Sequence, residues 1–300
     1  MHRYMRSIGF SKIADKKELQ QLITNVIIEG TQRSYTSNGE DTLLAEFCRD
    51  FAQDENGAGS SIGIAVCGEF ESDDKFIYDY YFPYLRGTHI SSKEDVSVER
   101  HAAQESYAGV CDDIRLGVSL IFYLQNMIPY VKAKNSDILP VRGTTLTLSA
   151  LSVKGNIMMP INKSEKDLIR NKQVAMNRSQ LLNAARKGDE EAIENLTLDD
   201  MDTYTAISRR IQKEDVFSLV DTYFMPYGVE CDHYSILGEI EECSLIKNKL
   251  TEEEIYLLAI NCNDMVFDLC INKEDLYGEP CIGRRFKGVI WMQGHINFPD

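Results

Sequence analysis

From Val229 onward, short runs of β-type residues replace the charged, helical composition that precedes them. Four strands are predicted from these runs, at residues 234–246, 254–261, 265–271 and 286–292. So many strands joined by short turns within about 70 residues favour a small barrel or a sandwich. We predict a five-stranded, OB-like barrel over residues 229–300, in which Gly283 and Gly288 allow sharp bends.

An amphipathic helix is predicted over residues 15–29, because apolar side chains recur there at helical spacing. Asp15 and Glu18 resemble a capping box, and Gly30 stands where a left-handed residue commonly ends a helix. An antiparallel meander is then predicted from three β-type runs, at residues 42–51, 61–70 and 75–84.

A long, apolar helix is predicted over residues 107–134. Its most apolar part spans about 16 residues, whereas a bilayer span needs about 20, so the pattern predicts a buried helix and no membrane segment. Residues 144–153 and 156–161 predict two strands, joined by a turn at Lys154-Gly155-Asn156. The fold class is therefore predicted to be α+β, with helices packed on an antiparallel sheet.

A chain of 300 residues suits two or three domains. We predict an α+β domain over 1–162, a helical connector with an αα-hairpin over 163–228, and the small barrel over 229–300. The barrel segment carries 14 acidic and 6 basic residues within a chain of net charge −15. Nucleic acid is therefore not an expected partner, because neutralising phosphates needs the opposite balance.

The eight cysteines show no C-x-x-C pair and no histidine partner at metal-binding spacing, so neither zinc nor another cofactor is expected. Residues 1–17 lack the apolar run of a signal peptide. We therefore predict a cytoplasmic protein with reduced cysteines. The G-x-S-x-G and H-E-x-x-H signatures of familiar hydrolases are missing as well.

Basic and aromatic side chains interleave only near the end of the sequence. Arg284, Arg285, Lys287 and Trp291 lie within one β-type segment that includes the only tryptophan. This pattern predicts a binding face for a protein partner, since arginine and tryptophan are common interface anchors. A closing barrel strand with charges in water would produce the same pattern.

A second candidate site combines a histidine with carboxylates. On a helix, His101 and Glu105 would share one face, and Asp112 and Asp113 follow closely. These groups could form an acid/base or metal site. The alternative is an ordinary helix start, because aspartates are favoured at the positive N-terminal end of a helix.

Three stretches of the sequence resemble an uncharacterised clostridial family that is catalogued only as a domain of unknown function. The resemblance covers essentially the whole chain and is carried by MHRYMRSIGFSKI, by SVERHAAQESYAGVCDDIRLGVSLIFYLQNMIPYV, and by DVFSLVDTYFMPYGVECDHYSILGEI with GRRFKGVIWMQG. It implies a cytoplasmic protein of an anaerobic Firmicute. It implies no catalytic or binding residues.

The first functional hypothesis is therefore a non-enzymatic intracellular binding or adaptor protein that uses the OB-like barrel to capture a protein partner. The first alternative is an enzyme with an acid/base or metal site near His101. The second alternative is single-stranded nucleic acid binding through the barrel. The sequence leaves the partner and the oligomeric state open.

Overall fold

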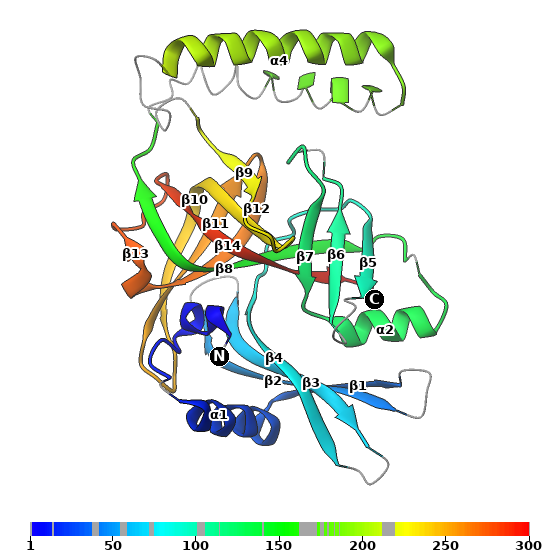
Figure 1. Cartoon of the computed structure of the whole chain (residues 1–300), viewed down its shortest axis with the longest axis vertical. Helices are drawn as coiled ribbons and strands as arrows, with labels where there is room; N and C mark the ends of the chain where they lie inside the picture. The colour runs from blue at the N-terminus through cyan, green and yellow to red at the C-terminus, as the bar shows by residue number, and fades with distance from the viewer. Residues whose placement is uncertain are drawn as a thin grey trace.

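Two β-sheets carry most of the chain in this computed structural model (Figure 1). The structure describes residues 2–299 apart from 14, 38–41, 55–58, 72–74, 101–105, 114, 140, 162–172, 175–176, 179, 183, 186 and 212–219. The first sheet is antiparallel in the order β1-β2-β3-β4. Its strands are β1 (Gln32–Ser37), β2 (Leu43–Gln53), β3 (Ser61–Phe70) and β4 (Phe76–Arg86). The predicted meander is thus confirmed.

Five of the described strands close into a barrel in the cyclic order β8-β12-β11-β10-β14. They are β8 (Thr145–Met158), β10 (His233–Lys247), β11 (Glu254–Cys262), β12 (Met265–Asn272) and β14 (Arg285–Asn297). The pairing of β12 with β8 is parallel, whereas β14 pairs antiparallel with both β8 and β10. The four strands predicted after Val229 are confirmed. The fifth, β8, comes from within the predicted domain 1–162, and the predicted domain boundaries stay predictions.

Shorter elements extend this framework. From β14 the sheet continues through β7 (Leu120–Leu124) and β6 (Tyr107–Cys111) to β5 (Val96–Arg100). Two short strands pair with the barrel, β9 (Tyr223–Pro226) with β10 and β13 (Leu276–Tyr277) with β8. The described helices are η1 (Arg3–Ile8), α1 (Lys16–Glu29), α2 (Met127–Asn135), α4 (Glu190–Ile211) and η2 (Lys273–Asp275). The class is mixed α and β, with mostly strands and few helices.

Helix α1 forms as predicted, with Leu22, Ile23 and Val26 buried on one face. The carboxylate of Asp15 accepts a hydrogen bond of 2.8 Å from the Glu18 amide, which satisfies one open donor of the first turn. The prediction of a left-handed Gly30 is wrong, since its φ is −56°. Glycine is needed there for space, because a Cβ atom would lie 2.6 Å from the Val26 carbonyl oxygen.

Two other secondary-structure predictions are wrong. Residues 107–134 form β6, β7 and α2 instead of one helix. In place of the hairpin predicted over 144–161, the structure has the single strand β8, Thr145–Met158. Gly155 lets β8 pack closely against the ring of Phe286 on β14, because a Cβ atom at this position would lie 2.3 Å from that ring. Of the predicted connector, α4 is described as a helix, whereas much of the preceding half of the αα-hairpin lies outside the described residues.

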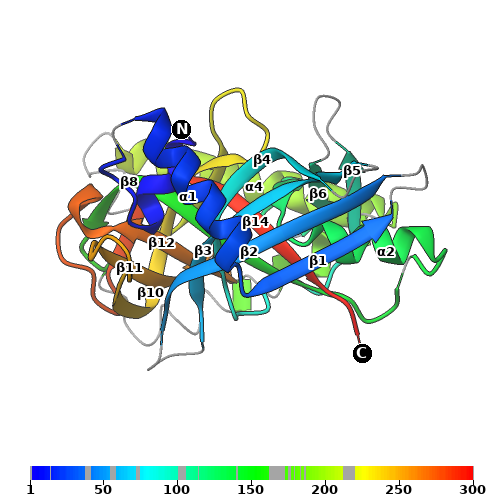
Figure 2. The same ribbon diagram turned by 90° about the horizontal axis from the view of Figure 1, so that it is seen from below.

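The barrel separates two hydrophobic clusters. Strand side chains alternate between faces, so Ile290 and Met292 point into the cluster that fills the barrel, whereas Trp291 belongs to the cluster outside it. The outer cluster also includes residues of η1, α1 and the first sheet. The first sheet therefore covers one side of the barrel, as Figure 2 shows from below.

Phe122 on β7 packs closely against two neighbouring strands and belongs to the same cluster as Ile290 and Met292. It is fully buried. Its ring occupies the space that a side chain would need at Gly109 on β6 and at Gly294 on β14, where a Cβ atom would lie 2.2 Å and 2.3 Å away. The two glycines thus let one aromatic ring join β6, β7 and β14.

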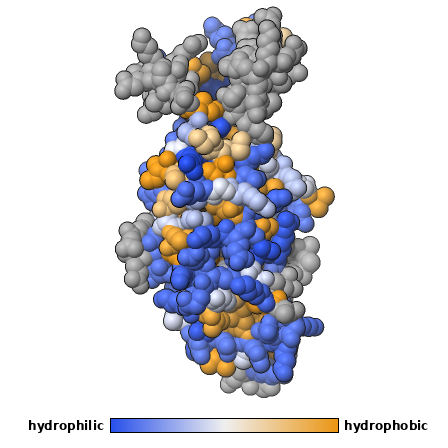
Figure 3. All heavy atoms as spheres, turned by 90° about the vertical axis from the view of Figure 1, so that its left-hand side faces the viewer, coloured by the Kyte–Doolittle hydropathy of each residue, from blue (hydrophilic) through white to orange (hydrophobic). Residues whose placement is uncertain are grey.

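The apolar residues of the described helices and of one face of the surface are relevant to membrane spanning and to partner binding. None of the described helices combines the length and the apolar character that crossing a bilayer requires. On the face shown in Figure 3, hydrophobic residues lie in separate groups among hydrophilic ones. No single patch on that face identifies a partner surface.

Candidate functional site

Two members of the predicted basic and aromatic face are buried on the outer side of β14. Arg285 donates hydrogen bonds to the carbonyl oxygens of Met159 and Val220, at 3.1 and 2.8 Å. Trp291 is 4% exposed and donates a 2.7 Å hydrogen bond from Nε1 to Asp232. These two side chains therefore do not lie on an open surface.

The other two members are half-buried and also interact within the chain. Arg284 donates to the carbonyl oxygen of Glu279 at 2.7 Å, and Lys287 has an interaction of its own. The rings of His2, Tyr4 and Tyr123 lie 4.7 to 5.4 Å from the Trp291 ring, so aromatic side chains enclose it. The four residues do not form one common binding face.

The predicted cluster around His101 is described only in part, since His101 and Glu105 lie outside the described residues. Asp113 is buried and accepts hydrogen bonds from Ser92 Oγ at 2.7 Å and from Arg115 Nε at 2.8 Å. Asp112 is exposed and accepts a hydrogen bond of 2.5 Å from Ser119 Oγ. The Asp113 carboxylate is thus engaged by its own neighbours.

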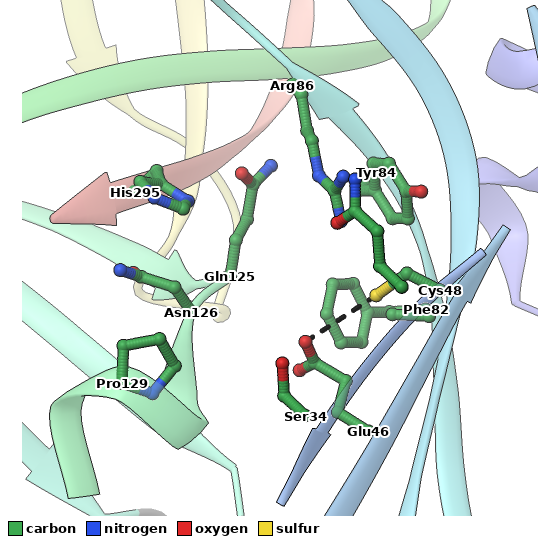
Figure 4. Close-up of a pocket in the computed structure, with 12 residues that line it drawn as sticks. Ser34, Glu46, Cys48, Phe82, Tyr84, Arg86, Gln125, Asn126, Pro129 and His295 are labelled. Atoms are coloured by element: carbon green, nitrogen blue, oxygen red, sulfur yellow. Dashed lines mark hydrogen bonds between the residues drawn. The ribbon is translucent and has the colours of Figure 1, made fainter. Parts of the chain in front are cut away.

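A cavity of about 240 Å³ lies between the first sheet and the barrel (Figure 4). Strands β1 to β4 supply one wall, and the β7–α2 segment and β14 supply the other. Its lining residues are Gln32, Ser34, Glu46, Cys48, Ala65, Phe82, Tyr84, Arg86, Gln125, Asn126, Pro129 and His295. We call it the Arg86 cavity, and it brings charged and polar side chains from distant segments together.

Arg86 is held in place by an aromatic ring. Its guanidinium carbon lies 4.7 Å from the centre of the Tyr84 ring. The Tyr84 hydroxyl donates a 2.7 Å hydrogen bond to Asp50, which fixes the ring. The ring lies over Gly63, where a Cβ atom would be 2.3 Å from the Tyr84 hydroxyl oxygen. Gly63 therefore makes room for the ring on which the guanidinium rests.

We expect Gly63→Ala to lower the free energy of unfolding by about 1 to 3 kcal/mol, because the added methyl group collides with Tyr84 and with the Arg49 carbonyl oxygen. Denaturant unfolding followed by circular dichroism measures this change. An unchanged midpoint would show that the Tyr84 ring does not lie over Gly63 in solution.

Two polar side chains from the barrel side face Arg86. Gln125 is buried and donates from Nε2 to the Leu85 carbonyl oxygen at 2.9 Å and to Gln293 at 2.8 Å. Among the described residues nothing donates to its Oε1, which leaves an acceptor for a ligand. Burial, together with the nearby charge of Arg86, lowers the pKa of His295 to about 4. The His295 imidazole is therefore neutral at physiological pH.

Glu46 is 8% exposed and lies across the cavity from Asn126 and His295 (Figure 4). Its two carboxylate oxygens accept only thiol hydrogen bonds among the described residues, from Cys48 at 3.5 Å and from Cys67 at 3.7 Å. Burial raises the pKa of the Glu46 carboxyl to about 6, although the thiols and the charge of Arg86 oppose the rise. A carboxyl with this pKa can bind a cation or exchange a proton near neutral pH.

This pKa predicts a pH-dependent loss of stability. A folded-state pKa above the ordinary 4.5 means that protonated Glu46 favours folding, so stability falls as the pH rises from about 4.5 to about 6. We expect the free energy of unfolding of wild type to fall by about 2 kcal/mol relative to that of Glu46→Gln between pH 4.5 and 6. Outside this window the difference between the two proteins should be constant.

Urea denaturation at a series of pH values tests this prediction, with the exposed Glu279 changed to glutamine as the matched control. Parallel stability profiles for wild type and Glu46→Gln would contradict the raised pKa.

A second cavity of about 300 Å³ lies outside β10 to β12. There His89 Nδ1 lies 2.8 Å from an Asp268 oxygen, and the other oxygen accepts the amide hydrogen of Thr88 at 2.8 Å. Asp268 on β12 thus fixes the segment that follows Arg86. Among the residues described, no group of three His, Cys, Asp or Glu side chains is placed to hold a metal ion.

Sequence reasoning missed the Arg86 cavity because Glu46, Arg86 and His295 lie on three separate strands that are far apart in the sequence. Two local signals pointed to it. Glu46 is the only charged residue in the run LLAEFC, and Gly63 stands between two isoleucines in a strand. A lone charge in a buried strand is a candidate for function, because such burial is costly without a partner.

The comparisons with known proteins give one match. A family model described as "Domain of unknown function, E. rectale Gene description (DUF3881)" matches residues 5–294, which include both the first sheet and the barrel. No curated protein and no solved structure matches the chain. The resemblance predicted from the sequence is confirmed.

Proposed function

Because the chain belongs to the DUF3881 family, whose description gives no activity, we propose a function from geometry: a non-enzymatic binding protein that holds a small organic anion in the Arg86 cavity. One observation carries the proposal. Among the described residues, the half-buried Arg86 guanidinium has no hydrogen-bond acceptor and no ion-pair partner, although it faces a cavity and rests on a fixed ring.

The chemistry of the cavity favours a carboxylate or a phosphate. A guanidinium offers paired N–H donors that match two oxygens of such a group, and partial burial strengthens the interaction. The neutral His295 adds no competing charge, and Gln125 Oε1 can accept a hydrogen bond from the ligand. At about 240 Å³ the cavity is below the usual range for drug-sized ligands, so the ligand is expected to be a small metabolite.

Calorimetric titration of the full chain with acetate, propionate and inorganic phosphate tests the proposal. Saturable binding by wild type, retained by Arg284→Met, is the supporting result. Arg284 is a matched control because it is an arginine of the predicted C-terminal face and lies outside the cavity. Loss of binding in Arg284→Met would place the anion elsewhere, and absence of binding in both proteins would overturn the proposal.

We also propose an OB-like identity for the barrel. An OB barrel has a three-stranded meander, its third strand pairs in parallel with the fifth, and the fourth lies between the fifth and the first. Here β10, β11 and β12 form the meander, β12 pairs in parallel with β8, and β14 pairs with β8 and β10. With β8 as the fifth strand, β10 as the first and β14 as the fourth, these neighbours match the OB order. The difference is that the fifth strand here precedes the first along the chain.

A cytoplasmic location and capture of a protein partner are further parts of the proposal. All eight cysteines are unpaired thiols, and five of them are buried, which supports a reducing compartment. The adaptor role rests on Arg284 and Lys287, since Arg285 and Trp291 are buried. Capture experiments with Arg284→Glu test it, because retained capture would remove Arg284 from the contact face.

The two alternatives stay predictions, and neither gains support from the described residues. An acid/base or metal site near His101 would have to compete with Ser92 and Arg115 for Asp113. Single-stranded nucleic acid binding needs exposed aromatic rings on a basic groove, whereas Trp291 is buried.

A further inference from the structure

Among the buried carboxylates that the structure describes, Glu46 has the weakest hydrogen-bond donors. Its carboxylate is more than nine-tenths buried, and among the described residues no N–H group donates to it and no cation pairs with it. The thiols of Cys48 and Cys67 are weak donors at long distances. A buried carboxylate left in this state is costly, and a strong donor from a ligand would offset that cost.

The carboxylate faces the same cavity as Arg86. Glu46 on β2 and Arg86 on β4 lie on the first-sheet side of the cavity, and Figure 4 shows the barrel-side residues opposite them. The two charges lie close enough for Arg86 to oppose the rise in the pKa of Glu46, yet they form no ion pair with each other. An acceptor and a donor of opposite charge are thus presented to one small space.

We propose that the ligand of the Arg86 cavity is a small zwitterion of the amino-acid class, whose carboxylate pairs with Arg86 and whose ammonium group pairs with Glu46. This inference rests on the proposed function. An ammonium group supplies three donors, which suits a carboxylate whose oxygens receive only thiols. Gln125 Oε1 is a further acceptor near the ligand.

The groups around Glu46 keep this charge pattern at neutral pH. They are Cys48, Cys67, Tyr80, Arg86 and Tyr123. Burial raises the pKa values of both thiols and both phenols, so these four groups stay neutral, and Arg86 stays positive. Binding of an ammonium group should therefore weaken as the pH falls below about 6, where Glu46 takes up a proton.

The test compares matched ligands by calorimetric titration of the full chain. Glycine, β-alanine and 4-aminobutyrate vary the distance between the two charges, and acetate, propionate and butyrate lack the amine. For wild type we expect at least one amino acid to bind about tenfold more tightly than its matched acid, the effect of one additional hydrogen bond to a charged group. Glu46→Gln should remove this preference and keep the affinity for the plain acid.

The outcomes separate this inference from the proposed function. If acids bind equally well with and without the amine, the ligand is a plain anion, and only the zwitterion is overturned. If neither series binds, the proposed function fails. Should Glu46→Gln not fold, the ratio of affinities measured on wild type alone decides the question.

Discussion

Arg86→Met is expected to weaken the binding of a carboxylate ligand about 100-fold. Methionine keeps much of the apolar stem of the side chain but removes the guanidinium that lies on the Tyr84 ring and both N–H donors of the paired contact. At about 1.5 kcal/mol each, the lower end for hydrogen bonds to charged groups, the two donors account for a loss of about 100-fold. Arg86→Lys keeps the charge without the planar pair of donors, so an intermediate loss is expected. Calorimetric titration measures all three dissociation constants.

The same substitution should leave the fold intact. Because Arg86 has no hydrogen-bonding partner among the described residues, its removal breaks no hydrogen bond or ion pair there, and the losses are its contact with the Tyr84 ring and its attraction to the Glu46 carboxylate. The free energy of unfolding is therefore expected to fall by only about 1 to 2 kcal/mol, the size of a partly desolvated cation–π contact. An unchanged affinity, with Arg284→Met as control, would contradict the assigned role of Arg86.

Phe122→Ala is expected to lower the free energy of unfolding by about 3 to 5 kcal/mol. The ring is fully buried and fills the space above Gly109 and Gly294, and neither glycine has a side chain that could close the gap. This loss is a large part of the stability of an ordinary protein. Denaturant unfolding gives the value.

Two further variants keep this prediction testable. Phe122→Leu retains most of the volume and should cost about 1 kcal/mol, which can be measured even if the alanine variant does not fold. Phe298→Ala removes a ring that packs only partly against the same cluster, so its effect should be smaller. Equal losses for alanine at both positions would show that the packing between the glycines has no special weight.

The sequence predicted elements whose signal is local. Helix α1, the meander and the four late strands follow from spacing and capping, which depend on nearby residues. The helix predicted over 107–134 failed because a continuous apolar run is compatible with a buried strand or a buried helix. The hairpin predicted at Gly155 is wrong because glycine is needed there to make room for the ring of Phe286, which is distant in the sequence, and not to form a turn.

The candidate site was beyond this kind of reasoning for the same physical cause. Arg86, Glu46 and His295 are close in space only because the first sheet packs on a barrel whose last strand is β14. None of the three belongs to a motif. The C-terminal cluster predicted as a binding face is unusual in composition, but the side chains of Arg285 and Trp291 turn toward the protein's own interior.

The order of the barrel strands has a consequence for how the protein folds during synthesis. Strand β8 pairs with β12 and β14, which are synthesised more than 100 residues later. Helix η1 packs against β8 and β12. Both elements therefore lack their final partners until these later strands leave the ribosome. Pairings between such distant segments form slowly, since a long loop must close before any contact rewards it. A nascent chain stalled before β14 is therefore a natural substrate for chaperones, because the barrel interior is still open.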